Sequence, residues 1–228
     1  TAFLPTTMTV SYEELEKAFS AIRGVMRSPH PGEAIVLGAH AEGPFINVNK
    51  KGAQSAEFVR RPDADFVIRN KDVIKLITIA PETDEDFSEI KKIRSQTDAV
   101  ISMGHTDADY DTAIRAFKAG VSHATHLFNA MTGITHRAPG AAGAALFTEN
   151  VSCELICDTF HVHPALFSPV FRLKRDKFNL ITDCMRAGGM PDGEYDLGGQ
   201  KVTVNGIKCR LDDGTIAGSV LTLNKAVA

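Results

Sequence analysis

Five carboxylate or imidazole side chains fall at or just past the ends of short apolar segments rich in Val and Ile. They are Glu42, His105, His126, His161 and Asp183. A strand buried on both faces has little use for charge, so polar residues at strand ends need a reason beyond contact with water. Because α/β proteins bind ligands at the carboxyl ends of parallel strands, we expect these five residues to share one site.

One carboxylate and two imidazoles suit a catalytic zinc-type centre, in which three protein ligands leave a fourth position for water. We therefore predict that Glu42, His105 and His126 bind a divalent metal ion. Taken singly, each has an ordinary structural interpretation, as a hydrogen-bonded core histidine or a turn glutamate; their coincidence favours a metal. Zinc and iron both suit such ligands. We interpret His40 and His123, one or two residues off the strand ends, as packing or supporting residues.

The elements that must position these residues follow an α/β pattern. Short apolar runs alternate with longer stretches of helical period, which indicates a parallel sheet built from strand–helix units. Ser11 followed by Glu14 indicates a helix start, and a second helix is predicted from Asp107 to a stop at Gly120. Seven strands are predicted, at residues 2–7, 34–39, 73–80, 99–104, 122–128, 153–158 and 179–183.

Geometry favours a closed barrel over a flat sheet. In a flat sheet the strands that carry Glu42 and Asp183 would lie about 24 Å apart at roughly 4.8 Å per strand, too far to share a small site. A (β/α)8 TIM-type barrel has eight strands, so we predict an incomplete barrel over residues 1–192, comprising strands two to eight. Turn pairs at Asn205-Gly206 and Asp213-Gly214 predict a small β excursion over 193–219, and 220–228 the start of the last barrel helix.

Composition excludes several classes of function. The 228 residues are 43% hydrophobic and 23% charged, which is ordinary for a globular protein. The formal net charge of −3 offers no basic field for nucleic acid. The sequence contains no run of eighteen uncharged apolar residues, the pattern that predicts a membrane span. Four cysteines without CxxC spacing fit structural thiols in a reducing compartment. We expect a cytoplasmic protein that binds neither nucleic acid nor membrane.

Nine segments in order along nearly the whole chain resemble the N-acetylglucosamine-6-phosphate deacetylase family, metal-dependent (β/α)8 barrels of the amidohydrolase superfamily. The segments are AHAEGPFIN at 39–47, KKGAQ at 50–54, TIAPE at 78–82, MGHTDADY at 103–110, THLFNAM at 125–131, R-x-P-G and G-A-A at 137–145, CDTFHVHP at 157–164, ITDCMRAGGMPDGEY at 181–195 and IAGS at 216–219.

The resemblance implies a role for each matching position. Glu42, His105 and His126 match the metal ligands, and Asp183 matches the catalytic carboxylate that takes a proton from the attacking water. Arg137 matches an arginine that reaches the substrate phosphate across a dimer interface. Gln54 stands where several relatives have a histidine that stabilises the oxyanion. The other positions implied to bind substrate are Ala53, Asn129, Ala130, Asp158, His161, Ile216, Ala217 and Gly218.

The activity implied is hydrolysis of the acetamide of N-acetyl-D-glucosamine 6-phosphate to glucosamine 6-phosphate and acetate, in amino-sugar catabolism and recycling. The implied partners are a small sugar phosphate and a second copy of the chain in a homodimer. Because the family's first barrel strand has no match here, we expect these 228 residues alone to have little activity. Two alternatives stay open: an amidohydrolase for another N-acyl amino sugar, or a non-catalytic sugar-phosphate-binding fragment.

Overall fold

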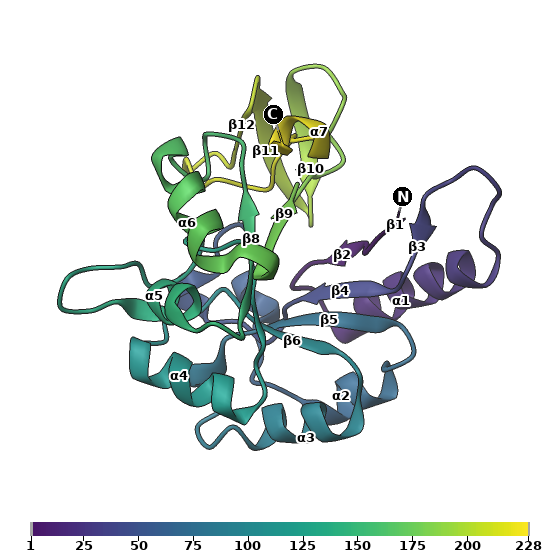
Figure 1. Ribbon diagram of the computed structural model, residues 1–228. Helices are drawn as coiled ribbons and strands as arrows, with labels where there is room; N and C mark the ends of the chain where they lie inside the picture. Colours follow the sequence, from purple (N-terminus) through teal and green to yellow (C-terminus); the bar gives the residue numbers. More distant parts are fainter. Residues whose placement is uncertain (1, 228) are drawn as a thin grey trace.

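The computed structural model describes residues 2–227 and contains a seven-stranded parallel sheet whose spatial order follows the chain (Figure 1). Each strand pairs with the next strand of the sheet, and parallel neighbours need a crossover connection between them. The sheet curls, which is consistent with an incomplete TIM-type barrel. Its strands are β2 (Thr6–Thr7), β4 (Ala39–Glu42), β5 (Ile74–Ile79), β6 (Val100–Met103), β7 (His123–Ala124), β8 (Ser152–Ile156) and β9 (Phe178–Ile181).

The prediction of seven parallel strands is confirmed, but two of them are split and one is too long. The predicted strand at 2–7 is two short strands, β1 (Ala2–Phe3) and β2, of which only β2 belongs to the seven-stranded sheet. The predicted strand at 34–39 is split: β3 (Ile35–Val36) pairs with β1 (Ala2–Phe3) in a separate two-stranded sheet, and the barrel strand β4 begins only at Ala39. Gly38 separates the two, with φ of +153° and so little room that a Cβ would lie 2.6 Å from the carbonyl oxygen of Val73. The apolar run at 35–37 is half exposed, whereas the buried strand reads Ala-His-Ala-Glu.

The strand predicted at 122–128 is likewise too long, since β7 ends at Ala124. The chain leaves the extended conformation at His126 and Phe128, which have φ of +29° and +78°. An apolar pattern cannot distinguish a strand from the tightly turned segment that follows it.

Helices cover the outer face of the sheet (Figure 1). As predicted, Ser11 caps α1 by accepting a hydrogen bond from the main-chain N–H of Glu14 (3.2 Å); Leu15, Phe19 and Ile22 form the buried stripe of this helix. The second predicted helix starts later than expected, capped by Asp109. The helices are α1 (Tyr12–Arg27), α2 (Ala64–Arg69), α3 (Ser88–Gln96), α4 (Tyr110–Ala119), α5 (Gly140–Phe147), α6 (Phe167–Lys174) and α7 (Leu223–Val227). Short 3-10 turns occupy Val48–Lys50, Ala56–Phe58, Pro81–Thr83, Pro164–Leu166 and Arg175–Lys177.

A three-stranded antiparallel sheet follows β9 along the chain. Its strands are β10 (Gly193–Leu197), β11 (Gln200–Asn205) and β12 (Lys208–Arg210), and they pack on a small apolar cluster that includes Val202, Val204 and Ala217. The side-chain amide of Gln200 donates to the carbonyl of Ala53, so this sheet contacts the loop after β4. Among residues 2–227, no helix is long and apolar enough to cross a membrane. Residues 1 and 228, the outer bounds of the predicted ranges 1–192 and 220–228, lie outside the residues that the structure describes.

Close packing around Gly104 predicts that a single added methyl group lowers the stability of the protein. A Cβ on Gly104, just after β6, would lie 2.7 Å from Thr78 Cγ2 and 2.8 Å from Thr125 Cβ. We expect G104A to lower the free energy of unfolding by about 1–3 kcal/mol through overpacking, measured by urea denaturation. The control is G24A on the exposed side of α1, where nothing lies within 4 Å, and which should gain about 0.5–1 kcal/mol. A G104A variant as stable as wild type would show that the packing is less tight than described.

Candidate metal and catalytic site

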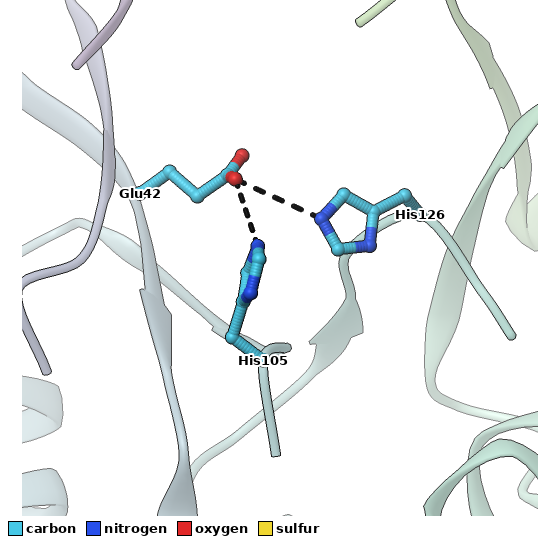
Figure 2. Close-up of side chains that lie close together, drawn as sticks. All are labelled: Glu42, His105 and His126. Carbon is cyan, nitrogen blue, oxygen red and sulfur yellow. Dashed lines mark hydrogen bonds and ion pairs between the residues drawn. The ribbon is translucent and has the colours of Figure 1, made fainter. Parts of the chain in front are cut away.

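Three predicted metal ligands meet at the carboxyl end of the curled sheet (Figure 2). Glu42 ends β4, His105 follows β6 and His126 follows β7. Glu42 Oε1 lies 3.0 Å from His105 Nε2 and 3.7 Å from His126 Nε2, and one ligand atom from each residue lies within 4.8 Å of the others. All three side chains are buried. Residues far apart in the sequence therefore face one point.

A repeated backbone turn places the site side chains. His105, His126 and Asp183 are each the second residue after the end of their strand, and their φ values are +49°, +29° and +49°. Non-glycine residues rarely adopt this left-handed conformation, which persists only where the surroundings enforce it. Main-chain hydrogen bonds do so here: the carbonyl of His105 accepts from Asn47 N (2.9 Å), and that of Asp183 accepts from Ser219 N (2.9 Å).

The ring nitrogens of the two histidines are oriented by main-chain carbonyls. His105 Nδ1 lies 2.7 Å from the carbonyl oxygen of Lys50, and His126 Nδ1 lies 3.2 Å from that of Asn129. A carbonyl only accepts, so each Nδ1 carries the proton and each Nε2 faces Glu42. This is the arrangement in which metal-binding histidines are commonly held.

The charges of the cluster also suit a cation. Burial alone would raise the pKa of Glu42, but hydrogen bonds from His105 and His126 hold it well below its usual value. Burial lowers the pKa of His126, yet the hydrogen bond and negative charge of Glu42 outweigh burial and raise it to about 9. Without a metal, the cluster thus holds a proton. A buried site that stabilises positive charge can exchange this proton for a metal ion.

Asp183 lies in the same cavity as the three residues. Burial, followed by the negative charge of Glu42, raises its pKa to about 7. A carboxyl group that titrates near neutral pH can both accept and return a proton during a reaction. The arrangement therefore joins a cation site to a general acid–base group.

The cavity has a volume of about 780 Å³, within the usual range for small-molecule sites. Eleven predicted site residues line it: Glu42, Ala53, Gln54, His105, His126, Asn129, Ala130, His161, Asp183, Ile216 and Gly218. Cys184, exposed and also in the lining, is the one cysteine of the four that is not buried.

Three predicted residues do not line the cavity. Asp158 lies behind it and accepts a hydrogen bond from His161 Nδ1 (2.6 Å), so it orients that ring. Ala217 is buried, and its N–H donates to the carbonyl of Cys209 (3.1 Å). Arg137 is exposed on the loop before α5, beside His136.

Gln54 supports Glu42 directly. Its amide nitrogen donates to Glu42 Oε1 (3.1 Å), and its Oε1 accepts from the main-chain N–H of Thr9 (2.7 Å). Gln54 therefore helps to hold the carboxylate as well as lining the cavity.

Two carboxylates beside the site were missed from the sequence. Glu82 accepts from the side chains of Asn47 (2.9 Å) and Thr106 (2.5 Å) and from Asp107 N (2.6 Å), which ties the loop after β5 to the turn around His105. Glu154 on β8 accepts from the main-chain N–H of His126 (3.2 Å). Glu82 ends the segment TIAPE, and nothing in its spacing marks it as a hydrogen-bond acceptor for the turn around His105; nothing in the apolar run around Glu154 indicates that its side chain reaches His126.

Comparison with known proteins agrees with this geometry. Residues 5–177 match the model of the amidohydrolase family. The chain belongs to the amidohydrolase family. It is 40% identical over 232 residues to the N-acetylglucosamine-6-phosphate deacetylase of Lysinibacillus sphaericus, covering 100% of this chain and 59% of that protein. It is 35% identical over 230 residues to the N-acetylgalactosamine-6-phosphate deacetylase of Escherichia coli O157:H7, covering 99% of this chain and 60% of that protein.

A solved structure matches this amidohydrolase chain closely. It is a mutant N-acetyl-D-glucosamine-6-phosphate deacetylase of Mycobacterium smegmatis in complex with N-acetyl-D-glucosamine-6-phosphate, with a TM-score of 0.91 and 33% identity over 99% of this chain and 59% of that one. The chain thus spans about three fifths of the length of these relatives.

The raised pKa of Asp183 predicts a pH dependence of stability in the metal-free protein. The pKa of Asp183 rises from an ordinary value of 3.8 to about 7 on folding, so the folded protein holds this proton more tightly than the unfolded chain does. The resulting contribution to the free energy of unfolding is fully present below the pKa of the unfolded chain and is lost as pH rises through the pKa of the folded protein. We expect wild type to lose stability relative to D183N between about pH 4 and about pH 7, by at most ~1.4 kcal/mol per pH unit. Urea unfolding with a chelator present measures this difference, and parallel curves for the two proteins would contradict it.

Proposed function

We propose that this protein is a metal-dependent deacetylase that hydrolyses the acetamide of N-acetyl-D-glucosamine 6-phosphate, giving D-glucosamine 6-phosphate and acetate. The observation that carries the proposal is the meeting of Glu42, His105 and His126 in one cavity with Asp183. Similarity along the whole chain to proteins named as deacetylases of amino-sugar phosphates supports it.

The proposed metal is a divalent cation, which one carboxylate oxygen and two imidazole nitrogens would hold. Zinc and iron are the best matches for such donors, and Gln54, Lys50 and Asn129 would orient the ligands through the hydrogen bonds described above. When bound, the metal supplies Lewis-acid chemistry, which polarises a carbonyl and makes water more acidic.

Asp183 is the proposed general acid–base residue. Its carboxylate takes a proton from the attacking water as the C–O bond forms at the acetyl carbon, and it gives that proton to the amine nitrogen as the C–N bond breaks. One carboxyl group can serve both steps because the proton that it accepts in the first is the one that it returns in the second; in the metal-free protein, burial and the charge of Glu42 raise its pKa to about 7. Removal of such a group costs typically 10²–10⁴-fold in rate.

The remaining lining residues are proposed to hold the sugar phosphate. His161, oriented by Asp158, would contact the substrate, and Asn129 with Ala130 would bind the phosphorylated end. Ile216, Ala217 and Gly218 would close over the sugar, a role that fits the presence of Ile216 and Gly218 in the cavity lining.

We further propose that an eighth barrel strand outside these 228 residues closes the sheet between β9 and β2. In this arrangement residues 1–192 belong to the hydrolase barrel, the antiparallel sheet at 193–219 belongs to a small β domain, and 220–228 begin the last barrel helix. The reaction would serve amino-sugar catabolism and recycling in the cytoplasm.

A related substrate remains a second candidate. The Escherichia coli relative is named for N-acetylgalactosamine 6-phosphate, which differs from the proposed substrate in the orientation of one hydroxyl group. Steady-state kinetics on both phosphorylated sugars distinguish the candidates: the proposed function predicts the higher kcat/KM for the glucosamine compound, and the opposite order would favour the alternative.

The central test joins metal loading to turnover in the protein that carries the complete barrel. We expect deacetylation after loading with zinc or iron, loss of metal and turnover in H126A, and retained metal with ~10²–10⁴-fold lower kcat in D183N. K174M serves as the control, because Lys174 is buried and bonds only to main-chain carbonyls of Ala145 and Thr148. Full turnover by D183N would refute the assigned role of this residue.

Arg137 carries the proposed link between phosphate binding and dimerisation. It is exposed and does not line the cavity of its own chain, which is compatible with a role in the partner's site. A guanidinium can grip phosphate oxygens in a bidentate manner. We therefore expect R137A to raise KM for the phosphorylated sugar at least ~10-fold, the loss of about 1.4 kcal/mol, with little effect on unphosphorylated N-acetylglucosamine.

R115A provides the control for a general loss of surface charge, because Arg115 is exposed on α4, where it donates to Thr112 and lies over the ring of Phe87, away from the cavity lining. An unchanged preference for the phosphorylated sugar in R137A would remove Arg137 from the phosphate site.

A further inference from the structure

Beneath the candidate metal site, a buried carboxylate connects three neighbouring segments. Glu154 lies in the middle of β8 and is 5% exposed. Its Oε2 accepts from the main-chain N–H of His126 (3.2 Å), and its Oε1 accepts from His123 Nε2 (3.0 Å). One side chain thus binds both β7, through its first residue, and the turn that follows this strand.

Further contacts fix this arrangement from both sides. The main-chain carbonyl of Glu154 accepts from Leu127 N (2.9 Å), and the Nδ1 of His123 lies 2.6 Å from Ser152 Oγ. A carboxylate can only accept hydrogen bonds, so His123 Nε2 must carry the proton. The residues on either side of the turn are therefore held to β8 by a fully partnered carboxylate.

The position of this contact is unusual for a purely structural one. Burying a carboxylate is costly unless it is partnered, and a strand can satisfy its neighbour with main-chain groups alone. Here the charged side chain takes the N–H of the very residue whose φ of +29° turns its imidazole toward Glu42. Loss of this acceptor would leave a buried N–H without a partner in a conformation that few residues adopt.

We propose that Glu154, held by His123, is a positioning residue that fixes the main-chain turn at His126 and so aims His126 Nε2 at the metal. The inference rests on the proposed function, because it assumes that His126 is a ligand. Glu154 does not touch the metal or the substrate in this role; it acts through the main chain of His126. The same logic does not extend to His105, whose ring and carbonyl are held by main-chain groups of Lys50 and Asn47.

Metal affinity separates positioning from general stability. We would measure Zn²⁺ binding by competition with a chromophoric chelator, record the visible spectrum of the Co²⁺-loaded protein, and follow urea unfolding of the metal-free protein. E154L removes the acceptor, and we expect 10–100-fold weaker Zn²⁺ binding, as is typical when a residue that orients a metal ligand is lost, together with a changed Co²⁺ spectrum. E154Q keeps a carbonyl oxygen for His126 N–H, and we expect it to bind Zn²⁺ within about threefold of wild type.

The matched control is again K174M, which removes a buried amine with two hydrogen bonds to main-chain carbonyls at the C-terminal end of α5. We expect it to lower stability without changing Zn²⁺ affinity or the Co²⁺ spectrum. Should E154L fail to fold, E154A, which leaves space for water, replaces it.

Wild-type Zn²⁺ affinity in E154L, equal losses in E154L and E154Q, or an equal loss in K174M would overturn the inference. H126A distinguishes this failure from failure of the proposed function. If H126A loses Zn²⁺ while E154L retains it, the site stands and Glu154 has no positioning role; if H126A also retains Zn²⁺, the metal site itself is wrong.

Discussion

A buried negative charge at Glu42 is the constraint on which this structure depends. The carboxylate lies at the end of β4 with little access to water, so it needs positive charge beside it. The proton that His126 retains supplies this charge, because the pKa of His126 is raised to about 9, while His105 and Gln54 add hydrogen bonds to the carboxylate. The elements around these residues serve to keep two imidazoles pointed at one carboxylate, and any cation that replaces the proton meets ligands already in place.

Curling of the sheet makes this convergence possible, and the turns after the strands complete it. The strand ends bring residues separated by up to about 140 positions, from Glu42 to Asp183, to one edge. A regular strand would then carry its side chains alternately to the two faces. The left-handed residue two positions past the ends of β6, β7 and β9 instead turns the chain abruptly at each site residue. Backbone strain and site geometry are thus products of the same turns.

Much of this organisation was predictable from the sequence, because it depends on periodic apolar runs and on polar residues at their ends. The seven parallel strands and the meeting of Glu42, His105 and His126 follow from that pattern. The true start of β4 does not, since the barrel strand carries His40 and Glu42 while the exposed run before it is more apolar. The role of Glu154 also escapes prediction: a single acidic residue in an apolar strand does not reveal which main-chain N–H its side chain accepts from.

The hydrogen bonds of the four buried histidines explain why only two of them, His105 and His126, belong to the candidate metal cluster. His40 Nε2 bonds to Thr78, and Thr78 bonds in turn to Thr125; His123 is engaged by Glu154 and Ser152. Both rings have partners inside the sheet, and neither residue lines the cavity. His105 and His126 use Nδ1 for main-chain carbonyls, which leaves Nε2 of each directed at Glu42. Hydrogen bonding within the polar interior therefore determines which nitrogen atoms remain available to a metal.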